Sequence, residues 1–81
     1  MRLPRSIRFE RSYASAPQTI RRAFDKQSLL LLRNLHHPSL RTKKYDAGLD
    51  LWQARVNRDW RSYFRIRENV YEIVDMLPHP K

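Results

Sequence analysis

Arginines and apolar side chains alternate in residues 58–67, RDWRSYFRIR. The two sets are Arg61, Arg65 and Arg67 against Trp60, Phe64 and Ile66. Because successive side chains of a β-strand point to opposite faces, this period of two predicts one apolar face and one cationic face. Guanidinium groups bind phosphate through paired N–H donors, and fixed positive charge stabilises the negative charge of a phosphoryl transition state. The stretch therefore favours phosphate chemistry on the cationic face.

A second alternating segment, LWQARVN (51–57), places Arg55 on the same cationic face. Residues 57–59 are short enough to make a tight connection between the two strands. We therefore expect Arg55 and Arg61 to flank one hairpin, within reach of a single phosphate group. Like charges directly across two strands destabilise a sheet, and a bound anion relieves that cost. The alternative is an exposed sheet face whose arginines are only solvated.

Proton transfer needs another kind of residue, because arginine stays protonated while histidine titrates near neutral pH. His79 follows the last predicted strand and so emerges at one end of the sheet. We interpret it as a candidate general acid or base, the alternative being a frayed terminal side chain. Asp59 is either a base or the cap of the hairpin, and we favour the cap. His36 and His37, with one distant histidine, give little support to a metal site.

The loop HPSLRTKK (37–44) adds Arg41, Lys43 and Lys44 just before the cationic face. A cationic loop beside a cationic sheet predicts a groove for a polyanion rather than scattered surface charge. Aromatic rings in such a groove stack on unpaired bases. The candidate rings are Tyr45, Tyr63 and Tyr71, and for each of them a purely structural role is an equal alternative.

The elements that must position these side chains follow from the hydrophobic periodicity. Alternation predicts strands at 6–13, 51–57, 60–67 and 70–77, with a turn at Glu68-Asn69. A period of 3.6 predicts a helix from Pro17 to about Leu35 with Ser15 as its cap, and residues 36–50 are predicted to be loop. The predicted fold is α+β: a small, mostly antiparallel four-stranded sheet in the order β-α-β-β-β, or with a helical hairpin, and a helix packed on one face. The side chains expected to face the helix are Trp52, Val56, Trp60, Phe64 and Ile66.

The composition limits the class of protein. The length of 81 residues predicts one domain, 1–81. Lys and Arg number 17 against 8 Asp and Glu, a net charge of +9, so we expect a polyanionic partner rather than a merely solvated basic surface. The absence of cysteine excludes disulfides and thiolate metal sites and suits a reducing cytoplasm. No apolar run approaches the roughly 20 residues of a membrane span, and we expect no signal peptide and no membrane partner.

Three segments together resemble one known family. HPSLRTKK, LWQARVNRDWRSYFRI and VYEIVDMLPHPK resemble the toxins of bacterial type II toxin–antitoxin modules, the RelE/ParE superfamily. The resemblance extends over roughly residues 6–79, and the loop with its following hairpin is the most specific part. It implies a RelE-like fold with the same order of elements.

The resemblance also implies an activity. RelE-like members are ribosome-dependent endoribonucleases that cut mRNA in the decoding site without a metal or cofactor, by attack of the 2′-hydroxyl on the adjacent phosphate. Arg61 matches a catalytic arginine of the family, and His79 lies where several members carry a terminal His, Tyr or Phe. Arg55, Lys43 and Lys44 match the cationic RNA-binding surface of the family. The residues expected to bind RNA phosphates are Arg41, Lys43, Lys44, Arg65, Arg67 and Lys81.

The expected partners are mRNA on the ribosome and a cognate antitoxin whose acidic segment would fold on the basic surface. Two alternatives stay open within the same fold. ParE-like members inhibit DNA gyrase, and a further possibility is a basic module that binds RNA without cleaving it.

Overall fold

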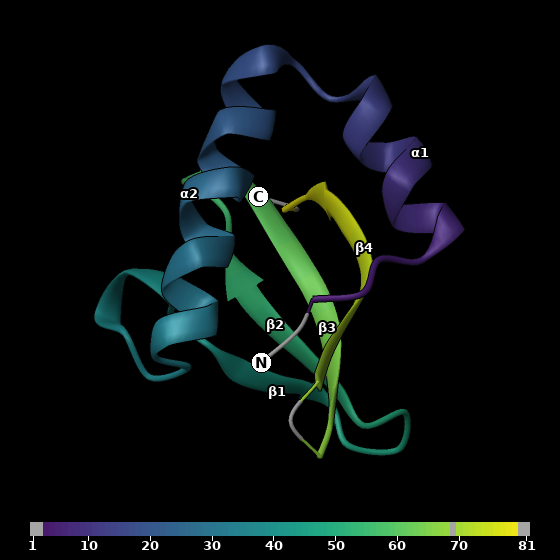
Figure 1. The fold of residues 1–81 in the computed structure, drawn as a ribbon, viewed down its shortest axis with the longest axis vertical. Helices are drawn as coiled ribbons and strands as arrows, with labels where there is room; N and C mark the ends of the chain where they lie inside the picture. Colours follow the sequence, from purple (N-terminus) through teal and green to yellow (C-terminus); the bar gives the residue numbers. More distant parts are fainter. Residues whose placement is uncertain (1–2, 69, 80–81) are drawn as a thin grey trace.

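The computed structural model describes residues 3–68 and 70–79, and within them it contains two α-helices and one four-stranded antiparallel sheet (Figure 1). The strands lie side by side in chain order, β1-β2-β3-β4. This confirms the predicted α+β class with a helix-covered sheet. The elements are α1 (Ile7–Ser15), α2 (Gln18–Arg33), the 3₁₀ helix η1 (Pro38–Leu40), β1 (Lys43–Asp46), β2 (Leu51–Arg55), β3 (Trp60–Arg67) and β4 (Val70–Pro78).

The prediction of a first strand at 6–13 is wrong, because these residues begin α1. Ser6 caps the helix by accepting a 3.0 Å hydrogen bond from the Phe9 backbone N–H. Phe9 is fully buried while Ile7 remains 74% exposed, so the apparent strand alternation does not correspond to a buried face. Just before this segment, Arg5 forms an isolated parallel bridge to Ile73 of the edge strand β4, and the Ser6 backbone N–H donates to the Ile73 carbonyl at 3.0 Å.

The fourth strand lies instead in the segment predicted to be a loop. Residues 43–46 form β1 and pair antiparallel with β2, Lys43 opposite Gln53 and Lys44 opposite Trp52. Three of the four β1 residues are exposed, so the strand lacks the apolar face that would have indicated it from sequence. Lysines on an edge strand also discourage pairing with other chains.

Helix α2 confirms the predicted central helix, with Ile20, Phe24 and Leu31 on its buried face. Its predicted cap is wrong. Pro17 occupies the N-cap position without a side-chain hydrogen bond, and the Ser15 hydroxyl donates to the Arg11 carbonyl, 2.9 Å away. Proline suits the start of a helix because the first N–H groups have no partner within the helix.

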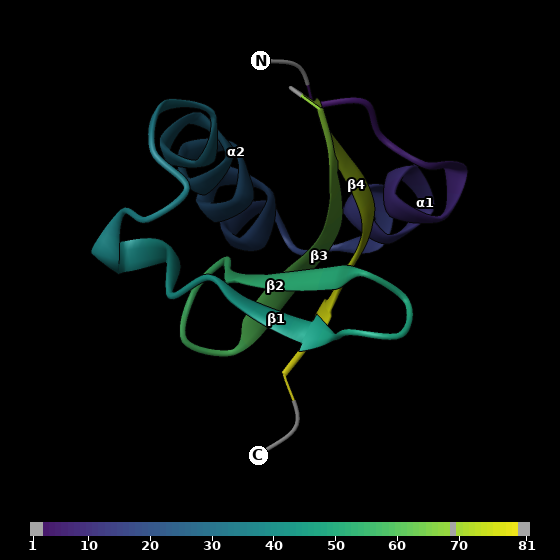
Figure 2. The same cartoon turned by 90° about the horizontal axis from the view of Figure 1, so that it is seen from below.

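The core lies between the two helices and the inner face of the sheet, and α1 runs beside the edge strand β4 (Figure 2). Phe64 of β3 is fully buried. The rings of Phe9 in α1 and Phe24 in α2 pack against each other, with their centres 4.8 Å apart. Removing a side chain of this size from water stabilises the fold by about 1.5–3 kcal/mol. The predicted helix-facing set is confirmed: Val56 and Phe64 are buried, and Trp52, Trp60 and Ile66 pack against them partly buried.

The β2–β3 connection is closed by Asn57. Its side-chain oxygen accepts hydrogen bonds of 2.9 Å from the backbone N–H groups of Asp59 and Trp60. The prediction that Asp59 caps the hairpin is therefore wrong, since the Asn57 side chain, two residues earlier, takes that role.

The β3–β4 turn contains Glu68 with a φ of 54°. Asn69, the second residue of the predicted turn, lies outside the described residues. A non-glycine residue in this conformation is uncommon, so no residue pattern predicts it for Glu68. Among the described residues, neither helix is both long and apolar enough to cross a membrane.

Candidate functional site

The outer face of the sheet, away from the helices, carries the predicted arginine pair. The β2–β3 register sets Arg55 directly opposite Arg61, as expected from the hairpin. The next pair on the same face is Gln53 and Tyr63, both buried, and the Gln53 amide donates to the Tyr63 hydroxyl at 3.3 Å. The two arginines thus extend from a rigid, tightly paired part of the sheet.

The Arg61 side chain is turned toward the β2–β3 loop. Its Nη1 atom donates to the carbonyl oxygens of Asn57 at 2.8 Å and Trp60 at 2.9 Å. Among the described residues its Nε and Nη2 atoms have no hydrogen-bond partner, so these donors are available to an anion. The loop therefore fixes the guanidinium while part of it remains free.

Electrostatics at Arg61 indicate an excess of positive charge. Partial burial is the largest cause that lowers the pKa of the Arg61 guanidinium, and the neighbouring charge of Arg55 lowers the pKa further. Tyr63 raises the pKa, and the smallest effects come from Arg41, which lowers it, and Asp59, which raises it. Arginine nevertheless stays protonated in proteins. The unfavourable interaction among these cations is therefore a cost that a bound anion would offset.

A groove of about 470 Å³ continues from Arg55 between α2, η1 and the β2–β3 loop. We call it the basic groove. No residue that lines it carries a carboxylate. Its lining residues are Ala23, Lys26, Gln27, Pro38, Ser39, Arg41, Arg55, Val56, Asn57 and Arg58.

The walls of the basic groove are held together by Gln27 of α2. Its side-chain amide donates to the carbonyl oxygens of Ser39, at 3.2 Å, and Arg55, at 3.1 Å. Arg41 follows η1 in a left-handed conformation, with φ 47°. This conformation is uncommon outside glycine, and it turns the chain where η1 meets β1.

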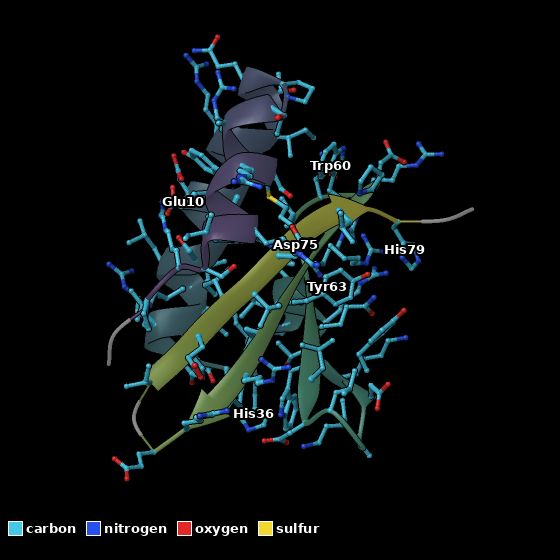
Figure 3. The ribbon with its side chains drawn as sticks, turned by 90° about the vertical axis from the view of Figure 1, so that its right-hand side faces the viewer. Glu10, His36, Trp60, Tyr63, Asp75 and His79 are labelled. Carbon is cyan, nitrogen blue, oxygen red and sulfur yellow. The ribbon has the colours of Figure 1, made fainter. Side chains whose placement is uncertain are left out.

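His79 lies at the same end of the sheet as Arg61. Its backbone N–H donates to the Asp59 carbonyl at 2.6 Å, which joins the end of β4 to the β2–β3 loop. Its Nδ1 atom is buried and has no hydrogen-bond partner among the described residues. Figure 3 shows His79 on the side of β4 where Tyr63 lies, with Trp60 on the other side.

Three other predicted phosphate-binding residues do not join this cluster. Lys44 points to the opposite face, where its Nζ lies 2.6 Å from Asp50 Oδ1 and 4.9 Å from the centre of the Trp52 ring. Arg65 and Arg67 lie at the far end of β3. Lys43 stays on the outer face opposite Gln53, and Lys81 lies outside the described residues.

The far end of β3 carries an acidic side chain beside its arginines. Arg67 Nε lies 3.2 Å from Glu72 Oε1, and Arg65 Nε donates to the Leu49 carbonyl at 3.2 Å. Glu72 is also directly opposite Arg65 in the β3–β4 register. These arginines are consequently less available to an external anion than Arg55 and Arg61.

The three tyrosines differ in their exposure. Tyr45 is 57% exposed and packs edge-on against buried Tyr63, with ring centres 5.0 Å apart. Tyr71 is buried among the core residues and contacts Phe64 at 5.7 Å. Tyr71 is therefore a core residue with a structural role and is not a stacking surface for RNA bases. The Tyr45 ring is open to solvent on the outer face.

The sequence reasoning missed Lys26, Gln27 and Arg58 as lining residues of the basic groove. Lys26 and Gln27 lie on a helix whose polar side carries several cations, and nothing in that pattern distinguishes them. Only the contact between α2 and the end of β2 brings them near Arg55. Arg58 is the exception, since an arginine inside the predicted tight turn was visible in the sequence.

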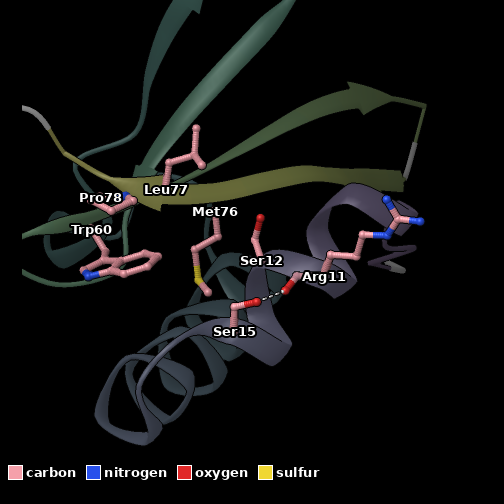
Figure 4. A pocket seen from close by; sticks show the side chains of 7 residues that line it. All are labelled: Arg11, Ser12, Ser15, Trp60, Met76, Leu77 and Pro78. Atoms are coloured by element: carbon pink, nitrogen blue, oxygen red, sulfur yellow. Dashed lines mark hydrogen bonds between the residues drawn. The ribbon is translucent and has the colours of Figure 1, made fainter.

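A second cavity, of about 310 Å³, opens between α1 and the ends of β3 and β4 (Figure 4). Both of its hydroxyl groups are engaged: Ser12 donates to Asp75 at 2.6 Å, and Ser15 donates to Arg11. Trp60 and Met76 supply much of its apolar lining. The cavity therefore offers apolar surface without a free nucleophile or base.

The remaining histidines have local roles. The His37 ring nitrogen Nδ1 accepts a 3.2 Å hydrogen bond from the Ser39 backbone N–H and caps η1. His36 is exposed. Within residues 3–68 and 70–79, no group of three or more His, Asp or Glu side chains is arranged to hold a metal ion.

Comparison with known proteins identifies the fold. No protein-family model matches the chain, and no curated protein matches its sequence. Among solved structures, the YoeB/ParE toxin from Agrobacterium tumefaciens has a TM-score of 0.81 at 12% identity, over 99% of this chain and 100% of that chain. YafQ from E. coli strain BL21(DE3) has a TM-score of 0.79 at 15% identity, over 95% and 91%.

An archaeal relative in fold is the RelE–RelB complex from Pyrococcus horikoshii OT3, with a TM-score of 0.78 at 20% identity, over 95% of this chain and 92% of that chain. At sequence identities of 12% to 20%, the similarity to these structures shows a common fold alone. This chain is an α+β protein built as those toxins are. More narrowly, it has the fold of the RelE- and ParE-type toxins, as its loop and hairpin motifs predicted.

Proposed function

We propose that this chain is the toxin of a toxin–antitoxin module and cleaves mRNA on the ribosome. The observation that carries the proposal is the Arg55–Arg61 pair, two cations held face to face with free guanidinium donors and no carboxylate in the adjoining groove. A sheet gains nothing from that arrangement by itself. It is useful where a negative charge develops.

The proposed reaction is an attack of a ribose 2′-oxygen on the adjacent phosphorus. A bond forms between the 2′-oxygen and phosphorus, and the bond from phosphorus to the 5′-oxygen breaks. The products are a 2′,3′-cyclic phosphate and a 5′-hydroxyl end. Arg61 and Arg55 stabilise the charge of the five-coordinate phosphorus, which by analogy with other preorganised donors contributes about 10²–10³ in rate.

His79 is the proposed proton carrier. The proton of the 2′-hydroxyl must leave, and the departing 5′-oxygen must receive one. Imidazole performs such transfers near neutral pH, whereas neighbouring guanidinium groups cannot. Its attachment to the β2–β3 loop through Asp59 keeps it at the end of the sheet where Arg61 lies.

The proposed inhibitor is a cognate antitoxin. The YoeB–YefM complex from Staphylococcus aureus and the RelE–RelB complex from Pyrococcus horikoshii OT3 are toxin–antitoxin pairs with folds like this one. For this chain, a net charge of +9 favours an antitoxin segment rich in acidic residues. Such a segment would neutralise the Arg55–Arg61 pair and exclude RNA from it.

The test uses purified protein, 70S ribosomes and an mRNA positioned with a defined codon in the A site. Primer extension is expected to show a cut within that codon, with product ends of the kind described above. A matched mRNA with one 2′-deoxynucleotide at the cut position is expected to stay intact, because the attacking oxygen is missing.

Two results would contradict the proposal. Intact ordinary mRNA together with loss of DNA supercoiling by gyrase would assign the chain to the gyrase inhibitors. Intact mRNA that is nevertheless bound with high affinity would indicate an RNA-binding protein that does not cleave.

A further inference from the structure

The basic groove adjoins the Arg55–Arg61 pair and extends away from it toward α2. Its cations come from separate segments of the chain: Lys26, Arg41, Arg55 and Arg58. Among the described residues, none of the four lies within 4.0 Å of an Asp or Glu oxygen, since the ion pairs there involve other cations. The fold therefore gathers four charges and leaves them unneutralised.

The groove is formed before any ligand arrives. The Gln27 side chain connects the two sides of the groove, because it donates hydrogen bonds to the Arg55 carbonyl at the end of β2 and to the Ser39 carbonyl in η1. Asn57 fixes the β2–β3 loop that carries Arg58. Pre-formed binding sites lose less conformational entropy on association.

The lining of the groove distinguishes between two kinds of polyanion. A protein segment needs apolar anchors in buried pockets for most of its binding energy. Here the apolar lining is small: Ala23 and Pro38 offer little area, and Val56 is already buried in the core. A nucleic-acid backbone presents a row of phosphates and needs mainly cations. The groove accordingly fits RNA better than an acidic peptide.

We propose that the basic groove binds the phosphate backbone of the RNA strand beside the nucleotide held by Arg55 and Arg61. Lys26 and Arg58 are its positioning residues, and Arg55 belongs to both parts, so the strand passes from one to the other. This inference rests on the proposed function, because it describes how that substrate is held. It adds residues and a direction for the strand that the arginine pair alone does not supply.

The experiment measures binding without cleavage. The probe is a short, fluorescein-labelled single-stranded RNA with 2′-O-methyl groups throughout, titrated by fluorescence anisotropy at several salt concentrations. The double variant Lys26→Gln, Arg58→Gln is expected to bind about tenfold more weakly near physiological salt, and the slope of log affinity against log salt should fall by about 0.7 for each lost contact.

The matched control removes the same charge elsewhere. Arg8 of α1 and Arg22 of α2 are exposed and do not line the groove. The double variant Arg8→Gln, Arg22→Gln is expected to change affinity less than threefold. A second variant, Lys26→Arg with Arg58→Lys, retains the charges and is expected to restore binding, which separates lost contacts from a folding defect.

Two outcomes would overturn the inference. Equal losses of RNA affinity in the groove variant and the control variant would show that the effect reflects only the net charge of the protein. Unchanged RNA binding, with a glutamate-rich peptide losing affinity only in the groove variant, would assign the groove to an acidic protein segment. If the salt slope changes as expected while ribosome-bound mRNA stays intact, RNA binding by the basic groove is supported and the proposed cleavage is refuted.

Discussion

The two ends of β3 both carry arginines on the outer face of the sheet but place them in different surroundings. Near the β2–β3 loop, Arg61 faces another arginine, Arg55, across the strands. At the opposite end, Arg67 Nε lies 3.2 Å from the carboxylate of Glu72. We call these the open end and the paired end.

The difference shows why total charge is a poor guide to the site. At the paired end, the Glu72 carboxylate lies beside Arg67 and opposite Arg65, so an external anion must compete with a negative charge that is already there. At the open end, partial burial and then the neighbouring charge of Arg55 lower the pKa of Arg61, and a bound anion would offset both effects. Function is expected where charge remains uncompensated, and the following predictions test that comparison.

The largest effect is expected from Arg61→Ala at the open end. Loss of the guanidinium should reduce the rate of mRNA cleavage about 100- to 1000-fold, because the charge of the transition state loses a preorganised donor. Single-turnover cleavage on programmed ribosomes measures this rate. The thermal midpoint should change by less than about 5 °C, since the side chain lies on the outer face and contributes little to the core.

The matched variant is Arg65→Ala, which removes an arginine four residues further along the same strand face. It should slow cleavage less than tenfold, through weaker binding only. Equal effects of the two variants would remove the distinction between the open and paired ends.

How much of this could be predicted from the sequence depended on the range of the interactions. The Arg55–Arg61 pair was predictable, because strand alternation and a short turn fix which residues face each other. Segment 6–13 was not, since Phe9 and Ile7 have similar character and only packing decides that Phe9 is buried. The pairing of Glu72 with Arg67 and the position of Lys26 in the basic groove likewise depend on tertiary contacts, which leave no local pattern in the sequence.

His79→Gln is expected to have the next largest effect. Glutamine retains hydrogen bonding but cannot transfer a proton near neutral pH, so cleavage should slow about 100-fold while RNA affinity stays unchanged. The dependence of the cleavage rate on pH should flatten as well. His36→Gln, on an exposed side chain, is the control and should leave both the rate and its pH dependence intact. An unaltered pH profile in His79→Gln would show that another group carries the proton.

Glu72→Gln should make the paired end resemble the open end. With the carboxylate neutralised, Arg67 becomes available to a phosphate, and affinity for single-stranded RNA should rise about three- to fourfold near physiological salt, with a salt slope steeper by about 0.7. The cleavage rate of bound mRNA should not change, because the new contact lies away from Arg61. The control is Asp25→Asn, which removes the same charge on α2, where the carboxylate has no ion pair among the described residues. A gain of the same size in the control would reflect net charge alone.

Asp50→Asn is expected to have the smallest effect. The hydrogen bond and charge of Lys44 hold the pKa of Asp50 below its usual value of 3.8. A carboxyl whose pKa is lowered by folding contributes stability above its unfolded pKa and loses that contribution as pH falls through the folded pKa. The urea midpoints of wild type and variant should therefore differ slightly at neutral pH and converge below about pH 3.8. RNA affinity should stay the same, because Lys44 points away from the outer face. A marked change in RNA affinity would instead mean that Lys44, once released from Asp50, reaches the RNA, and that the boundary between paired and open charges lies elsewhere.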